Sequence, residues 1–206
     1  MIGVRSKGRP IDLAEGEMRE RLLRSSALLF AERGYVATSV QAIVDSAGTT
    51  KPMVYYYFQN KEGLYRALID EAFGRIRRKL EAIDVMPGNI DQALRAVVEA
   101  NFELYRESPE IARFSLAPLL GPDHGVPDVD VRALGTLNYR FVRQIVTMGI
   151  SQGKLTGNAD AIALALVGQI VIYQTAQLMN PEIPVLRQQT AQHMVDLLLN
   201  GARVRL

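Results

Sequence analysis

Apolar residues recur with helical spacing along most of the chain, and no stretch keeps the alternation of apolar and polar residues that is typical of a strand. The pattern predicts an all-α fold, with glycine or proline between most of the helices. The expected helices cover residues 17–33, 39–47, 51–58, 61–82, 90–106, 109–120, 129–152, 158–179 and 185–200.

Two short helices near the N-terminus are expected to be joined by a glycine turn. Thr38 can cap the first helix, with Gln41 at the spacing of a capping box. Gly48 can adopt the positive φ angle that a tight turn needs. Thr50 can cap the second helix, where Pro52 is tolerated because the N–H groups of a first turn lack partners. This arrangement is the sequence form of a helix-turn-helix.

The expected elements divide the chain into an arm and two domains. We expect a flexible basic arm over residues 1–11 and a three-helix head with the helix-turn-helix over residues 12–60. A helical bundle would follow over residues 61–206, in which the helix 61–82 links the bundle to the head. Pro87-Gly88-Asn89 marks the break after this linking helix.

The second short helix is predicted to present an outward surface. At about 100° per residue, Val54 and Phe58 share one face and would pack on the neighbouring helix. Pro52 and Tyr56 would lie on the opposite side. Three consecutive tyrosines point in three directions, so they cannot all be buried. An aromatic, hydroxyl-rich surface with one lysine suits phosphate hydrogen bonds and base-edge contacts in the major groove, and Lys61 could add a phosphate contact.

The segment Thr38–Leu64 resembles the DNA-binding domain of the tetracycline-repressor (TetR) family, and Ala27–Tyr35 is similar to the first helix of that domain. The resemblance covers about the first third of the chain and is specific in residue type and spacing. The matching residues are Thr38-Ser39, Ala47-Gly48, Thr49-Thr50-Lys51, Val54-Tyr55-Tyr56-Tyr57-Phe58 and Asn60-Lys61-Glu62-Gly63-Leu64.

The resemblance implies a sequence-specific transcriptional regulator, by family default a repressor that a small-molecule effector releases from its operator. Carried over by position, Thr38 and Lys61 would contact phosphate. Pro52 stands where Gly or Ala is more usual, and Met53 where a small hydroxyl residue is common, so the specificity would differ from that of relatives. The recognition-helix contacts would come from Thr49, Thr50, Lys51, Pro52, Tyr55, Tyr56 and Tyr57.

Part of the arm, Lys7-Gly8-Arg9-Pro10, resembles the short Gly-Arg-Pro segments that lie in A·T-rich minor grooves. The arm could therefore add groove and phosphate contacts. A disordered basic tail without a DNA role is the alternative.

The expected helix 158–179 is apolar nearly all round, whereas a surface helix of a monomer should show a polar stripe. One face would pack in its own domain and the other against a second copy. Members of the TetR family pair through their last two long helices, so the resemblance implies a homodimer on a palindromic operator. A central helix in a monomeric core is the alternative. The expected interface residues are Ile162, Leu166, Ile170, Val195 and Leu198.

A cavity for a neutral, lipophilic or aromatic effector is implied by the resemblance. Aromatic residues with a few polar groups among them suit such a cavity, although each could equally be an ordinary core residue. The candidates are Phe102, Tyr105, Phe114, Tyr139, Met148, Gln169, Tyr173 and Gln177.

Composition narrows the function classes. The net charge of the 206 residues is only +2, so DNA binding must come from a local patch. The absence of cysteine excludes disulfides and thiolate zinc sites, in agreement with a reducing cytoplasm. The two histidines, His124 and His193, are far apart in sequence, and neither a phosphate-binding loop nor a nucleophile motif is present, so no metal, cofactor or enzyme activity is expected.

No signal peptide is expected, and the apolar run Ala161–Tyr173 falls short of the roughly 20 residues that span a bilayer, which predicts a cytoplasmic protein without membrane contact. Two other functions stay open. The head could dock another protein instead of DNA, or the protein could bind DNA constitutively without an effector.

Overall fold

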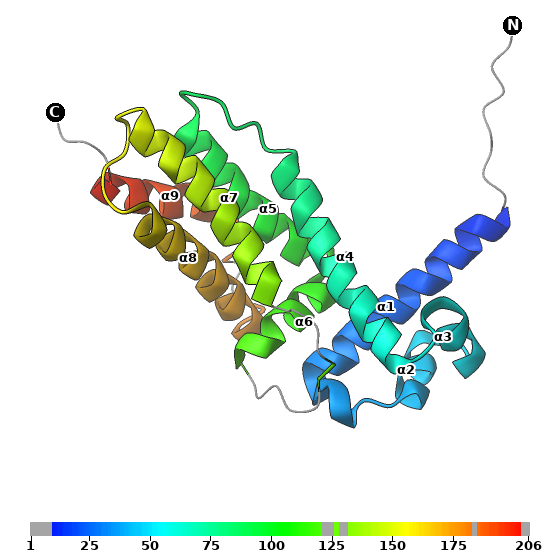
Figure 1. Cartoon of the computed structure of the whole chain (residues 1–206). Helices are drawn as coiled ribbons and strands as arrows, with labels where there is room; N and C mark the ends of the chain where they lie inside the picture. Colours follow the sequence, from blue (N-terminus) through cyan, green and yellow to red (C-terminus); the bar gives the residue numbers. More distant parts are fainter. Residues whose placement is uncertain (1–9, 121–125, 128–131, 183–184, 203–206) are drawn as a thin grey trace, which may run out of the picture. The chain divides into compact units, whose positions relative to one another are not determined.

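The computed structural model describes residues 10–120, 126–127, 132–182 and 185–202 of the chain (Figure 1). In these ranges the regular elements are helices and no strand occurs, which confirms the predicted all-α fold. The helices are α1 (Pro10–Ala37), α2 (Val40–Ala47), α3 (Lys51–Phe58), α4 (Lys61–Glu81), α5 (Ile90–Glu107), α6 (Pro109–Leu120), α7 (Arg132–Ser151), α8 (Ala159–Met179) and α9 (Gln188–Ala202).

Contacts group the chain into two units, and the division falls inside α4. The head comprises Met1–Ile69 with Pro122–Val129, and the body comprises Asp70–Gly121 with Asp130–Leu206. The division lies beyond the expected boundary at residue 60, because the first turns of α4 belong to the head. Leu64 in these turns is fully buried.

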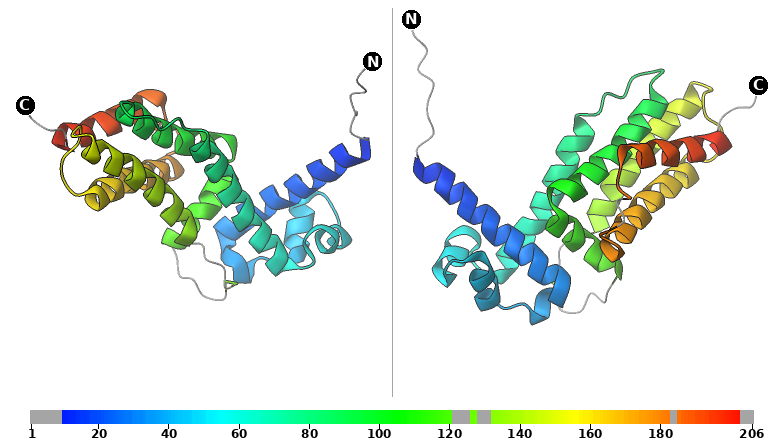
Figure 2. Two further views of the ribbon diagram at one scale, coloured as in Figure 1. Left: turned by 45° about the horizontal axis from the view of Figure 1, so that its top comes forward. Right: turned by 180° about the vertical axis from the view of Figure 1, so that it is seen from behind.

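In the head, α2 packs on α1 and α3 packs on α2 (Figures 1 and 2). Helix α1 begins at Pro10, well before the expected start at residue 17. The predicted break at Gly34 is confirmed, because its φ of 76° and ψ of 168° are not helical. Gly48 ends α2 in the left-handed conformation that was expected, with φ 61° and ψ 47°.

Two contacts fix the joints on either side of α3. A guanidinium N–H of Arg21, on α1, donates to the carbonyl oxygen of Ala47 at the end of α2, where the helix dipole favours a positive charge. At the joint with α4, the side chain of Asn60 accepts a hydrogen bond from the N–H of Gly63 at 2.7 Å. A Cβ atom at Gly63 would lie 2.0 Å from the carbonyl oxygen of Phe58, so glycine permits this close approach of α4 to α3.

The body encloses its core between α5, α7, α8 and α9 (Figure 2). Phe102, Leu94, Ile145, Leu166 and Val195 are among its fully buried side chains. Helix α7 ends one residue before its expected end at residue 152, and α9 begins three residues after its expected start at residue 185.

A partly buried amide network joins three helices of the body. The side chains of Asn101 on α5 and Asn138 on α7 exchange two hydrogen bonds, of 3.0 and 2.9 Å. Gln174 on α8 donates to the carbonyl oxygen of Asn101 at 3.2 Å. Because an unpaired polar group in an apolar core is costly, these bonds fix the three helices in one register.

Helix α8 is long and apolar enough to cross a membrane by length and composition alone. By this test its apolar stretch is longer than the expected run Ala161–Tyr173. Ala163, Leu166 and Ile170 on this helix lie in the core of the body.

Candidate DNA-binding surface

Helix α3 presents the outward surface that its sequence predicts. Val54 is fully buried and Phe58 is 5% exposed, so this face packs inside the head. Pro52 lies on the exposed side, where Tyr56 is 67% and Tyr55 53% exposed. Large aromatic side chains are seldom left this open in a head that buries most of its apolar residues, which makes the surface a candidate contact site.

The start of α3 supplies polar groups beside these rings. Lys51 is exposed, Thr49 is half-buried, and Thr50 occupies the N-cap position that was expected. Among the described residues, the hydroxyl of Thr50 makes no cap hydrogen bond to the helix. The ammonium group and the threonine hydroxyls are therefore available at the edge of the aromatic surface.

Tyr57 supports this surface and does not extend it. Its side chain is half-buried and its hydroxyl oxygen is buried, so this hydroxyl does not lie on the exposed surface. The ring lies edge-on to Tyr56, with centroids 4.9 Å apart, and 6.0 Å from the ring of Phe58. Tyr57 thus holds the exposed ring of Tyr56 from behind.

The structure places Thr38 inside the head. Its side chain is 1% exposed, and its hydroxyl donates to the carbonyl oxygens of Gly34 at 2.8 Å and Leu29 at 3.1 Å. Ser39 instead caps α2 by accepting a hydrogen bond from the N–H of Ala42 at 3.1 Å. The predicted cap at Thr38 is wrong, and the Thr38 hydroxyl is not exposed for the expected phosphate contact.

Lys61 is also tied into the head. Its ammonium donates to the carbonyl oxygens of Tyr35 at 2.7 Å and Thr38 at 2.8 Å. The ammonium nitrogen lies 4.1 Å from the centroid of the Tyr35 ring. Burial lowers the pKa of this half-buried ammonium. These contacts occupy the group that was expected to reach phosphate. The proposed arm contacts of residues 1–9 lie outside the described residues.

The head also matches a known family. The model for bacterial regulatory proteins of the tetR family matches residues 22–68, which include α2, α3 and the buried start of α4. Residues 22–68 therefore form the DNA-binding domain of the TetR family. Proteins of this family are DNA-binding transcriptional regulators and not enzymes, which confirms the class predicted from the sequence.

Individual proteins resemble the chain over different lengths. The HTH-type transcriptional regulator YdgC of Bacillus subtilis (strain 168) is 32% identical over 101 residues, which are 47% of this chain and 52% of YdgC, so the chain matches about half of that relative. The HTH-type transcriptional repressor ComR of Escherichia coli (strain K12) is 27% identical over 165 residues, 78% of this chain and 77% of ComR. The SmeT–triclosan complex has the same fold, with a TM-score of 0.69 and 19% identity over 91% of this chain and 92% of that chain.

TetR-family proteins typically act as dimers, and the body exposes an apolar surface on α8 and α9. Three of the expected interface residues do not contribute to it. Leu166, Ile170 and Val195 are at most 2% exposed and form the core of their own body, so predicting them as an interface is wrong. Ile162 and Leu198 are half-buried beside that core.

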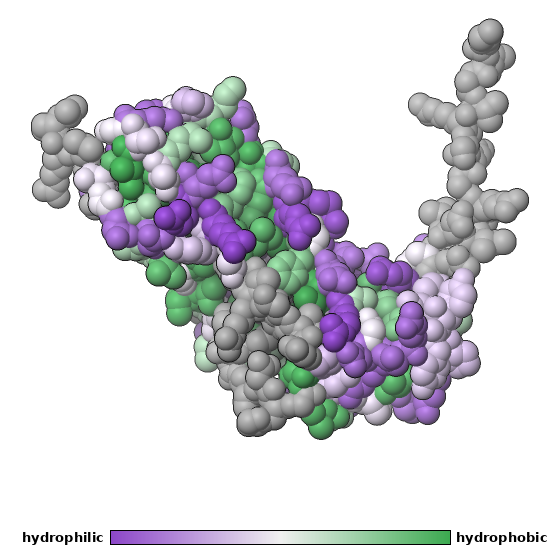
Figure 3. Space-filling view, viewed as in Figure 1, coloured by the Kyte–Doolittle hydropathy of each residue, from purple (hydrophilic) through white to green (hydrophobic). Residues whose placement is uncertain are grey.

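The opposite face of α8 is open to solvent. Leu164 is 62%, Ile172 66% and Met179 77% exposed, and Leu197 on α9 is 73% exposed. Figure 3 shows apolar surface along the edge of the body over which α8 runs. Small exposed residues lie between the large ones, namely Ala161, Ala165 and Gly168. We refer to these seven residues as the α8–α9 apolar face.

The residues that were expected to bind an effector differ in burial, and the structure brings only some of them together. Phe102, Tyr105 and Phe114 are at most 8% exposed. Tyr173 is half-buried, with its ring centroid 6.4 Å from that of Phe102, so the structure brings these two together. Met148 and Gln169 are half-buried as well.

Two of the expected effector residues make specific hydrogen bonds within the body. The hydroxyl of Tyr139 donates to the carboxylate of Asp160, which also accepts from Arg143 at 2.6 Å. Gln177 bonds the carbonyl oxygen of Pro181 at 3.1 Å and the N–H of Val185 at 3.0 Å, and so shapes the connection between α8 and α9. Both side chains are thus engaged in joining elements of the fold.

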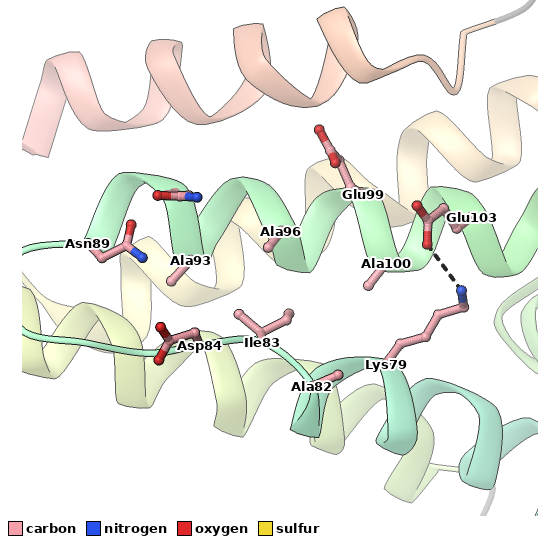
Figure 4. Close-up of a pocket in the computed structure, with 11 residues that line it drawn as sticks. Lys79, Ala82, Ile83, Asp84, Asn89, Ala93, Ala96, Glu99, Ala100 and Glu103 are labelled. Atoms are coloured by element: carbon pink, nitrogen blue, oxygen red, sulfur yellow. Dashed lines mark hydrogen bonds and ion pairs between the residues drawn. The ribbon is translucent and has the colours of Figure 1, made fainter.

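A groove of about 430 Å³ lies elsewhere in the body, between the end of α4 and α5 (Figure 4). None of the eight expected effector residues lines it. Ala82, Ala93 and Ala96 are among its lining residues, and Lys79 bonds Glu103 at 3.1 Å at one end.

Proposed function

We propose that the chain is a transcriptional repressor that binds a palindromic DNA duplex as a homodimer and loses affinity when a small-molecule effector binds its body. The observation that carries the proposal is the exposed face of α3, where Pro52, Tyr55 and Tyr56 point to solvent while Val54 and Phe58 hold the helix from behind.

This face suits the major groove of duplex DNA. The Pro52 ring and the tyrosine rings can contact thymine methyl groups, and the tyrosine hydroxyls can bond base edges or phosphates. Lys51 adds the cation that phosphate attracts. Thr49 and Thr50 are placed to contribute hydroxyls from the turn. We therefore assign the DNA contacts to Thr49, Thr50, Lys51, Pro52, Tyr55 and Tyr56.

A second copy of the chain is the proposed occupant of the α8–α9 apolar face. Four large apolar side chains that are each more than three-fifths exposed form a surface that water disfavours. The small residues Ala161, Ala165 and Gly168 would let two helices approach closely. A two-fold axis through this face would pair two heads, so the operator would contain two related half-sites.

An effector would act on the body. ComR is named a repressor, and SmeT was solved with triclosan, an observation that supports a small-molecule ligand for this fold. An effector that entered the core near Phe102 and Tyr173, whose ring centroids are 6.4 Å apart, would meet aromatic surface, which favours a neutral aromatic or lipophilic compound. Effector and DNA must weaken each other by the same coupling free energy. The setting of this regulation would be the cytoplasm.

The decisive test is selection of duplexes from a random pool by the full chain. A palindromic consensus that binds with strong salt dependence is expected. If no duplex is bound with such a salt dependence, the alternative in which the head docks a protein is favoured.

The effector is tested separately, by thermal denaturation of the protein with a library of neutral aromatic compounds. A stabilising compound that also releases the selected duplex is expected. If no stabilising compound releases the duplex, the alternative of a constitutive DNA-binding protein is favoured.

A further inference from the structure

The ammonium of Lys61 is hydrogen-bonded inside the head. A lysine has three N–H donors and no acceptor. Two of its donors are bonded to the carbonyl oxygens of Tyr35 and Thr38, at 2.7 and 2.8 Å. The ring of Tyr35 offers its face to the same nitrogen, 4.1 Å from the centroid. A phosphate at this ammonium would have to accept its third N–H or replace one of these carbonyl partners.

The two carbonyl groups belong to the α1–α2 corner, by which we mean residues 34–39. The chain leaves helical geometry at Gly34, so the last carbonyls of α1 lack the partners that a continuing helix would supply. Within the corner, the N–H of Thr38 also donates to the Tyr35 carbonyl, at 3.3 Å. Lys61 thus supplies a positive charge at the end of α1, which the helix dipole favours.

The Tyr35 ring extends the same arrangement into the head. Its centroid lies 5.5 Å from that of Phe30 on α1 and 5.1 Å from that of Tyr65 on α4. One end of the corner is therefore fixed by aromatic packing and the other by the buried hydroxyl of Thr38. Ser39, the N-cap of α2, follows directly.

We infer that Lys61 is a positioning residue for DNA binding: its ammonium fixes the α1–α2 corner, which sets the start of α2 and through it the placement of α3. The inference deepens the proposed function and rests on it. It assigns the phosphate contact expected from the lysines of this motif to Lys51, which is exposed at the start of α3.

The test compares Lys61→Met with Lys51→Met in the full chain, using the duplex selected above. Methionine keeps an apolar stem over the Tyr35 ring and removes the ammonium. For Lys51→Met we expect the slope of log affinity against log salt to fall by about one, with an unchanged unfolding midpoint. For Lys61→Met we expect the slope of the wild type, a lower unfolding midpoint without DNA, and an affinity about tenfold weaker at a temperature where the variant is fully folded.

Two results would overturn the inference. If Lys61→Met lowered the salt slope by about one and left the unfolding midpoint unchanged, Lys61 would be a phosphate ligand. If the folded variant bound DNA as tightly as the wild type, Lys61 would only stabilise the head. Lys61→Arg should recover part of the lost affinity, because a guanidinium can donate to both carbonyls.

Lysine acetylation rates, measured by mass spectrometry with an excess of acetylating reagent, give a readout that needs no variant. We expect slow labelling of Lys61 with and without DNA, and fast labelling of Lys51 that DNA slows. Equally fast labelling of the two lysines in the free protein would contradict the contacts that tie Lys61. Because this measurement on free protein does not need an operator, it is distinguishable from a failure of the proposed function, which would show as no DNA binding by the wild type.

Discussion

The proposed dimer can be tested by placing two carboxylates on the α8–α9 apolar face. Leu164 and Ile172 are 62% and 66% exposed in the single chain, so Leu164→Glu/Ile172→Glu should leave the fold of the body intact. Full burial of a leucine or isoleucine side chain contributes about 1.5–3 kcal/mol. Because each of the two side chains is about two thirds exposed in the single chain, the dimer can gain roughly two thirds of this free energy per side chain. A two-fold interface uses each residue twice, so the double variant should lose about 5 kcal/mol of association free energy.

This loss corresponds to between three and four orders of magnitude in the dissociation constant of the dimer, at about 1.4 kcal/mol per tenfold. Burying the four new carboxylates would weaken the dimer further, since they would face one another without partners. In sedimentation velocity at about 0.5 μM protein, a dimer with a nanomolar dissociation constant would become largely monomeric. The mass should fall from twice 22.9 kDa to 22.9 kDa.

Met86→Glu is a matched control, because Met86 is an exposed apolar residue, at 53%, that lies outside the α8–α9 apolar face. It should leave the dissociation constant unchanged. An unchanged sedimentation profile for the double variant, with a wild-type unfolding midpoint, would refute the assignment of this face. A wild type that is monomeric over the whole concentration range would refute the dimer itself.

Three further changes test the head and the body. Tyr56→Ala should weaken binding of the selected duplex by about 1–3 kcal/mol in fluorescence anisotropy and leave the unfolding midpoint unchanged; an unaltered affinity would show that the exposed ring does not enter the groove. Gly48→Ala should destabilise the head by about 2 kcal/mol in urea denaturation, because its φ is 61° and a Cβ would lie 2.9 Å from the Arg21 guanidinium. Gly48→Asn should cost less, since asparagine tolerates the left-handed conformation. Asp160→Asn should lower the unfolding midpoint at pH 7, because hydrogen bonds from Tyr139 and then Arg143 hold the pKa of Asp160 below its ordinary 3.8. The stabilisation by Asp160 is present above pH 3.8 and is lost as the pH falls through the lowered pKa, so the two proteins should converge in acid.

The orientation of α3 could be predicted because the helix is short and only two of its residues belong in the core. Val54 and Phe58 are four residues apart, so they lie on one face and leave one outward direction for Pro52 and Tyr56. In α8 the same argument fails. The residues of α8 are apolar on nearly all sides of the helix, so the sequence does not show which face is buried. Burial of Leu166 and Ile170 in the body assigns the opposite face, with Leu164 and Ile172, to solvent.

The roles of Thr38 and Lys61 could not be predicted from local sequence. Thr38 is placed as a cap by its spacing, but its hydroxyl bonds a carbonyl that is nine residues earlier in the chain. Lys61 lies at the start of α4, where a phosphate contact is plausible for any exposed lysine, and its partners are 23 and 26 residues away. Such bonds depend on how three helices pack, which periodicity does not describe.

Hydrogen bonds between residues far apart in sequence also hold the two ends of α4. At its first residue, Lys61 is bonded within the head. Further along, Lys79 bonds Glu103 and Glu107 within the body, at 3.1 and 2.9 Å, and Arg75 donates to the hydroxyl of Ser108. An effector that alters α5 would change the partners of Lys79, because both carboxylates project from that helix. The two ends of α4 are therefore each held by polar contacts within their own unit.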